Sequence, residues 1–168
     1  MPSQSVCASS SLLYLHFVDT DIKFCSFNIG GLVKKLEDSE FLNFIDKFDV
    51  ISLQETFMPK NNIPHNSLSS FLPPFFSPAF KLSSHGRCSG GVIVLVKSYL
   101  KDYVSEVQTD CPNCIILKFC NVLKKDVICI FPYVTCSDSP FYNNFDTKNG
   151  ITILERYLSD IFYKKTQF

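Results

Sequence analysis

One segment constrains the fold of this chain more than any other, because it shows the pattern of a strand, a helix and a second strand. Residues 22–28 (IKFCSFN) and 49–55 (DVISLQE) are apolar runs of strand length, and the second lacks the alternation of a half-exposed strand. Such a run predicts a strand that is covered on both faces. Between them, apolar residues recur at helical spacing over 41–48, with Asp38 or Ser39 placed to cap the helix. A unit of this kind packs its two strands in parallel, often as neighbours.

The rest of the chain continues to mix strand and helix patterns. Residues 58–80 hold five of the nine prolines and predict a long loop, and residues 92–97 (VIVLVK) predict a strand. Residues 114–119 and 127–131 predict a hairpin, and apolar residues at helical spacing over 151–162 predict an amphipathic helix. This interleaving of strands and helices predicts the α/β or α+β class.

The domain organisation is inferred from the length and from the N-terminal composition. A chain of 168 residues is long enough for one domain with a sizeable core. Residues 1–20 are rich in serine and then briefly apolar, so we expect a poorly ordered leader there and one domain over 21–168. The apolar run at 11–18 has no preceding Lys or Arg and no clear cleavage site, which argues against a signal peptide. No apolar run reaches the roughly 18 residues of a membrane span, so we expect no membrane partner.

Charge and cysteine content bear on partners and compartment. Lys plus Arg and Asp plus Glu both number 16, so the net charge indicates no polyanionic partner, although a local basic patch is compatible with one. Eight cysteines could form disulfides in a secreted protein, but Cys25 and Cys129 lie in apolar runs, where cysteine acts as a small hydrophobe. We therefore expect a reduced, intracellular chain, nuclear or cytoplasmic and not secreted. The CPNC segment at 111–114 has a zinc-like or redox-like spacing, but apart from Cys120 no further ligand follows suitably, which disfavours zinc.

Polar side chains end the two strands that are predicted to be parallel. Asn28 ends the first strand, and Glu55 ends the second, directly after Gln54. The carboxyl ends of such strands lie at one edge of the sheet, where open α/β sheets place ligands. A carboxylate beside a carboxamide suits Mg²⁺, which takes oxygen ligands and can stabilise charge that develops on a phosphate. The alternative is that both strands simply end in solvent.

These segments resemble an endonuclease/exonuclease/phosphatase domain, in particular the endonuclease of non-LTR (LINE-type) retrotransposons, which is similar to apurinic endonucleases. The resemblance rests first on the spacing from Asn28 through a helix to LQET within residues 22–57. The Gly-rich turn and strand at 85–97 and the segment at 127–145 then resemble the next parts of the family, in the same order. The resemblance covers roughly residues 22–163 of the chain.

The resemblance implies a fold, a reaction and roles for particular residues. The family fold is a four-layer α/β sandwich of two β-sheets flanked by helices. The family is a hydrolase that uses Mg²⁺ to cleave a phosphodiester of DNA, and the retrotransposon enzyme nicks DNA for target-primed reverse transcription. The implied role of Glu55 is that of a metal ligand, and Asn28 is implied as a neighbour of both the metal and the phosphate. The implied role of Gln54 is to support the residues that contact the metal without contacting the metal itself.

The sequence departs from the family pattern after the predicted hairpin. The family carries a Tyr followed by prolines there, and this Tyr reaches the phosphate. This chain has Phe131 at the expected position and Tyr133 two residues later. A Phe cannot donate a hydrogen bond to a phosphate oxygen. Tyr133 is therefore a catalytic candidate only through a different alignment or a bulge.

A second departure concerns the rest of the catalytic set. The family continues with a GDFN-like motif and a terminal SDH-like motif that holds or activates the water, and this sequence contains neither. Asp138 and His85 lie in the wrong segments, and His16 and His65 also precede the expected region. We therefore expect about the first two-thirds of a domain, truncated at its C-terminal side. We also expect it to be inactive, because general base catalysis alone contributes about 10²–10⁴-fold.

Nucleic-acid contact is predicted at the Gly-flanked turn that holds His85 and Arg87, since basic residues beside glycine suit contact with phosphates. The alternative is a solvated turn. For the whole chain, the alternative to an endonuclease is a non-catalytic remnant of a mobile element that binds nucleic acid or protein.

Overall fold

The computed structural model describes residues 11–16, 21–60, 68–81, 86–121, 126–135 and 150–165, and it describes their side chains except in 11–16 and 160–165. In chain order the elements are β1 (Ser11–His16), β2 (Asp21–Asn28), η1 (Val33–Glu37), α1 (Ser39–Ile45), β3 (Val50–Gln54), β4 (Phe75–Ser77), β5 (Phe80–Lys81), β6 (Cys88–Ser89), β7 (Val92–Val96), η3 (Ser98–Leu100), β8 (Val104–Val107), β9 (Cys114–Phe119), β10 (Val127–Pro132) and α2 (Gly150–Lys165).

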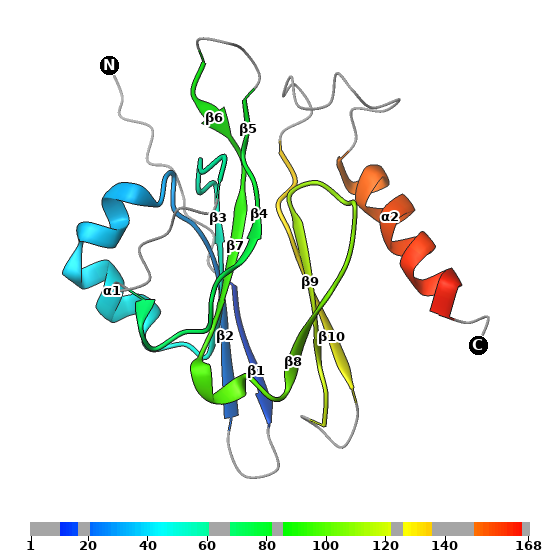
Figure 1. The fold of residues 1–168 in the computed structure, drawn as a ribbon, viewed down its shortest axis with the longest axis horizontal. Helices are drawn as coiled ribbons and strands as arrows, with labels where there is room; N and C mark the ends of the chain where they lie inside the picture. Colours follow the sequence, from blue (N-terminus) through cyan, green and yellow to red (C-terminus); the bar gives the residue numbers. More distant parts are fainter. Residues whose placement is uncertain are drawn as a thin grey trace.

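The described elements form four layers (Figure 1). A five-stranded sheet in the order β1-β2-β3-β7-β4 packs against a three-stranded sheet in the order β10-β9-β8, and β5 and β6 form a separate ribbon. Helix α1 with the short helix η1 covers the outer face of the larger sheet, and α2 covers the outer face of the smaller one. The structure therefore confirms the predicted four-layer α/β sandwich.

The β2–α1–β3 unit forms as its sequence predicts. Strands β2 and β3 pair in parallel, so that Asn28 lies level with Gln54 at their carboxyl ends. The Asp38 side chain caps α1 by accepting hydrogen bonds from the backbone amides of the following turn, at 2.9 and 3.3 Å. The residues of β3 from Val50 to Leu53 are fully buried, which confirms that both faces of this strand are covered.

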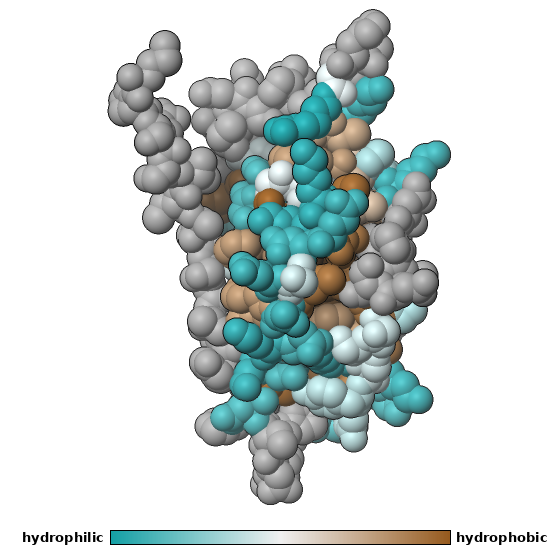
Figure 2. Space-filling view, turned by 90° about the vertical axis from the view of Figure 1, so that its left-hand side faces the viewer, coloured by the Kyte–Doolittle hydropathy of each residue, from teal (hydrophilic) through white to brown (hydrophobic). Residues whose placement is uncertain are grey.

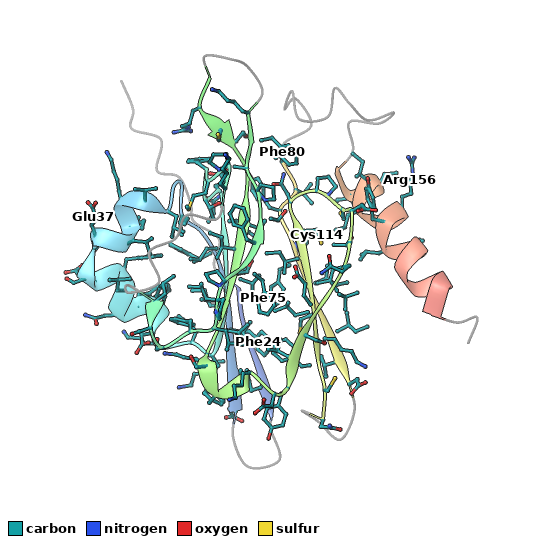
Figure 3. The ribbon with its side chains drawn as sticks, viewed as in Figure 1. Phe24, Glu37, Phe75, Phe80, Cys114 and Arg156 are labelled. Carbon is teal, nitrogen blue, oxygen red and sulfur yellow. The ribbon has the colours of Figure 1, made fainter. Side chains whose placement is uncertain are left out.

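Each interface between layers is filled by a separate apolar cluster. Alternate residues of β3 point to opposite faces, so Ile51 packs under α1 while Val50 packs between the sheets. Phe24 meets Phe119 edge to face between the sheets, with ring centroids 5.9 Å apart, and Phe75 joins the same cluster (Figure 3). The apolar face of α2 covers the outer side of β9 and β10.

The outer face of the helix layer is polar. Figure 2 views the molecule from this side and shows hydrophilic residues along it. The charged side chains of Lys34, Glu37 and Glu40 are exposed there, while Phe41 and Ile45 face inward. Within the described ranges, the helices are too short or too polar to cross a membrane.

The structure corrects the sequence analysis in three segments. Residues 11–16, which we assigned to a poorly ordered leader, form β1 and pair antiparallel with β2 from Ser11 opposite Ser26 to His16 opposite Asp21. This pairing satisfies the outer edge of β2, which a leader would leave open. The predicted loop over 58–80 contains β4, which pairs with β7, and β8 extends the predicted hairpin to three strands.

Candidate active site

Three strands end at the same edge of the sandwich, which is the upper end in Figure 1. Strands β2 and β3 finish there with Asn28 and Gln54, and β10 of the second sheet finishes there with Pro132. The turn that leads into β7 and the turn that leads into β9 lie at this edge as well, because both strands run in the opposite direction. The edge therefore collects side chains from both sheets.

Glu55 follows β3 in a left-handed backbone conformation, with φ of +55°. A residue with a Cβ adopts this conformation at a cost of about 1–2 kcal/mol, and such strain gathers at functional sites. The Glu55 side chain is half-buried, and its Oε1 accepts a hydrogen bond from the Tyr133 hydroxyl. Two side chains separated by 78 residues thus meet at the predicted site.

Tyr133 reaches Glu55 without a bulge in β10, which leaves the different alignment as the route by which Tyr133 would act at this site. The β9–β10 register is continuous from Val127 to Pro132, and the Tyr133 amide then donates to the Asn113 carbonyl at 2.8 Å. Phe131 lies in β10 and Tyr133 directly after it, and both rings face the first sheet. Both are half-buried against the apolar cluster between the sheets, and Tyr133 also reaches Glu55.

Gln54 connects the two sheets behind Glu55. Its amide nitrogen lies 3.2 Å from the Ser26 hydroxyl oxygen and 3.2 Å from the Pro132 carbonyl oxygen, and it can donate to both. These contacts hold the end of β3 against the ends of β2 and β10. The supporting role that the resemblance implies for Gln54 therefore has a geometric basis.

Asn28 lies beside Gln54 in the register, one residue from the level of Glu55. Its side-chain oxygen accepts a hydrogen bond from the Gly30 amide at 3.2 Å, which shapes the turn after β2. Gly30 has a φ of +59°, a conformation that suits glycine. The structure thus brings Asn28 and Glu55 to one edge, as predicted.

A second layer of contacts supports the loop after Glu55. The amides of Thr56 and Phe57 donate to the carbonyls of Gly91 and Gly90, at 3.2 and 3.0 Å. The Gly91 amide in turn donates to the buried side-chain oxygen of Asn113 at 2.9 Å. Asn113 therefore contacts both the Gly-rich turn and, through its carbonyl, Tyr133. The sequence analysis missed Asn113, although proline followed by asparagine in CPNC is a turn signal that could have found it.

Arg87 lies exposed on the Gly-rich turn, with its guanidinium 4.2 Å from the centroid of the Phe57 ring. A cavity of about 420 Å³ opens beside it, lined also by Gly30, Lys34 and Lys35. Arg87 thus lies next to the loops that follow Asn28 and Glu55. His85 and the motif-like Asp138 lie outside the described residues.

The donor set at this edge is compatible with Mg²⁺. Magnesium is commonly held by one or two carboxylates, and waters and substrate phosphates complete its shell. Glu55 supplies one carboxylate, and within the described part of the chain Tyr133 is the donor that occupies one of its oxygens. No group of three His, Cys, Asp or Glu side chains gathers among the described residues. A bound ion would neutralise charge on a phosphate at this edge.

The sequence matches no family model and no curated protein. Among solved structures, the AP endonuclease LMAP from Leishmania major is similar with a TM-score of 0.53 and 14% identity, over 79% of this chain and 48% of that chain. An AP endonuclease from Archaeoglobus fulgidus is similar with a TM-score of 0.51 and 18% identity, over 83% of this chain and 51% of that one. The chain thus spans about half the length of these proteins. The likeness shows that the chain has the fold of AP endonucleases, the endonuclease/exonuclease/phosphatase type.

Proposed function

We propose that this site belongs to an endonuclease of the non-LTR (LINE-type) retrotransposon kind, whose intact domain hydrolyses a DNA phosphodiester with Mg²⁺. The observation that carries the proposal is the hydrogen bond from Tyr133 of the second sheet to Glu55 of the first, with Asn28 beside it. Glu55 has a left-handed backbone, and its carboxylate accepts a hydrogen bond from a hydroxyl of the other sheet. This arrangement differs from that of a strand that simply ends in solvent. The LQET spacing and the AP endonuclease fold support the same reading.

The position of each residue suggests its role in this function. Glu55 would hold the metal through its carboxylate, and Tyr133 keeps this carboxylate directed toward the edge. Asn28 would orient the phosphate. Its side chain accepts from the Gly30 amide, and because the glycines of this turn have no Cβ, their backbone can lie close to the phosphate. The Tyr133 hydroxyl has a single proton, so when a phosphate enters the site it would donate to a phosphate oxygen in place of Glu55, which is the role that the family resemblance implies. Arg87, with Lys34 and Lys35 across the cavity, would contact the DNA backbone.

We further propose that these 168 residues bind DNA without cleaving it. Within the described residues no group of three His, Cys, Asp or Glu side chains gathers at the site, and the side chains of His16, His65 and His85 lie outside the described ones. The sequence offers neither a GDFN-like nor an SDH-like motif that could supply a group that activates water. A mobile-element remnant that binds nucleic acid is therefore the alternative function, and the basic cavity beside Arg87 favours nucleic acid over protein as its partner.

The deciding experiment measures binding and cleavage on the same DNA. The purified chain is incubated with supercoiled plasmid and with an oligonucleotide that carries one abasic site, with and without Mg²⁺. We expect binding that weakens as salt rises, no nicking, and weaker binding for Arg87→Gln. Glu55→Gln is the matched control, because it removes the charge and keeps the shape.

Each of the other outcomes would refute one part of the proposal. Nicking that disappears in Glu55→Gln would establish the endonuclease and refute the proposed inactivity. Faster cleavage at the abasic site than in plasmid would favour an AP endonuclease over the retrotransposon kind. A folded chain that neither binds nor nicks DNA would overturn the proposed function.

A further inference from the structure

The CPNC segment forms a tight turn that brings its two cysteines together. Pro112 and Asn113 are the central residues of the turn between Cys111 and Cys114, and Asn113 has a φ of +51°. Proline at the first central position and a positive φ at the second are the features of a type II turn. The ends of such a turn lie less than about 7 Å apart between Cα atoms, which is within reach of the separation that a disulfide spans.

The two cysteines are buried at the ends of this turn, and they line an accessible cavity. The Cys111 thiol donates to the Pro112 carbonyl oxygen at 3.9 Å, and Cys114 is the first residue of β9, where Figure 3 labels it. A cavity of about 460 Å³ is lined by both cysteines. The exposed Gln108 and Asp110 also line it, so a small solute can enter from solvent.

We propose that Cys111 and Cys114 form a reversible redox site that reacts with small hydroperoxides. The thiolate of Cys111 attacks one peroxide oxygen, which breaks the O–O bond and leaves a sulfenic acid on Cys111 while water or an alcohol departs. Cys114, which loses its proton to solvent, then attacks the Cys111 sulfur and forms the disulfide, and hydroxide leaves as water. Two electrons pass from the two sulfurs to the hydroperoxide, and a thiol reductant reverses the step.

The order of the two thiols follows from their environments. The hydrogen bond from Cys114 stabilises the thiolate of Cys111 and lowers its pKa, while the same contact raises the pKa of Cys114. Burial raises the pKa of Cys25, and it raises that of Cys129 to about 11. Cys111 is thus the attacking thiol, and the core cysteines are the poor competitors.

Oxidation of the two cysteines would alter the candidate active site through Asn113. This residue lies inside the turn that the disulfide would close, its side chain accepts from the Gly91 amide, and its carbonyl accepts from the Tyr133 amide. A change in the turn therefore displaces the supports of Glu55 from both sheets. The consequence for DNA rests on the proposed function, whereas the redox chemistry and the displacement do not.

The rates of oxidation test the chemistry. The chain is treated with hydrogen peroxide, the remaining thiols are alkylated, and each cysteine is followed by peptide mass spectrometry. Burial raises the pKa of Cys129 to about 11, while the contact with Cys114 lowers the pKa of Cys111, so Cys111 holds the larger thiolate fraction at neutral pH. The lower nucleophilicity of the less basic thiolate reduces this advantage without cancelling it. We expect the 111–114 disulfide to form about tenfold faster than Cys129 reacts, and to disappear with dithiothreitol.

Variants and a second readout keep the two parts separate. In Cys114→Ser the sulfenic acid on Cys111 should persist and be trapped by dimedone, and Cys88→Ser should behave like the unaltered chain. The Gly91 amide resonance should shift on oxidation and return on reduction. Oxidation of the pair no faster than Cys129, or links only between molecules, would overturn the redox site. A disulfide that leaves the Gly91 resonance unmoved would overturn the coupling to Glu55.

Discussion

The contact between Tyr133 and Glu55 can be tested by removing a single oxygen atom. Tyr133→Phe keeps the ring that packs against the core between the sheets and deletes the hydroxyl that donates to Oε1 of Glu55. The change therefore isolates the hydrogen bond from the packing. If the bond forms in solution, the free energy of unfolding must fall.

The magnitude follows from the charge and exposure of the two partners. A hydrogen bond to a charged group contributes about 1.5–3 kcal/mol when it is well buried. Both side chains are only half-buried here, so water replaces part of the lost interaction in the variant. We therefore expect a loss of about 1 kcal/mol, somewhat below this range. With a urea dependence of about 2 kcal/mol per molar, the unfolding midpoint should fall by about 0.5 M.

A double-mutant cycle supplies the measurement. Urea unfolding is recorded for the unaltered chain, Tyr133→Phe, Glu55→Ala and the combined variant, and the coupling energy is taken from the four values. We expect a coupling of about 1 kcal/mol, because the two side chains form one hydrogen bond. A coupling within about 0.3 kcal/mol of zero, with all four proteins folded, would refute the geometry on which the site rests.

Three further predictions concern backbone strain and charge. Because Glu55 has a φ of +55°, Glu55→Gly should be more stable in urea than Glu55→Ala by about 1 kcal/mol, and the reverse order would contradict the left-handed conformation. Gly91→Ala should lose about 2–3 kcal/mol in thermal unfolding, since its Cβ would lie 2.5 Å from a threonine oxygen, whereas Gly30→Ala, with open space around it, should lose only about 1 kcal/mol. The hydrogen bond and charge of Lys97 lower the pKa of Asp46, so stability that is present above pH 3.8 should be lost as the pH falls through the lowered pKa. Urea unfolding across this pH range should show a smaller loss in Asp46→Asn, and an equal loss would contradict the ion pair.

Local sequence determined the parallel unit at the centre of the fold. A buried apolar run, a capped helix and a second apolar run leave few alternatives, because their periodicity and burial are encoded within about forty residues. The positions of Asn28 and Glu55 follow directly, since both end strands of this unit. The hairpin of β9 and β10 and the amphipathic helix α2 were predictable for the same reason.

Only the tertiary structure decided which residues meet across the sheets. Whether Phe131 or Tyr133 faces Glu55 depends on how the second sheet is placed along the first, and no local pattern encodes that offset. The same holds for β1. Its short run does not predict a strand by itself, and it forms one because it pairs with the edge of β2. Asn113 is the clearest example. The sequence predicts its turn, but its hydrogen-bond partners Gly91 and Tyr133 come from two other segments that no local pattern connects to it. Periodicity fixes the face on which a side chain lies, while packing between layers fixes what that side chain touches.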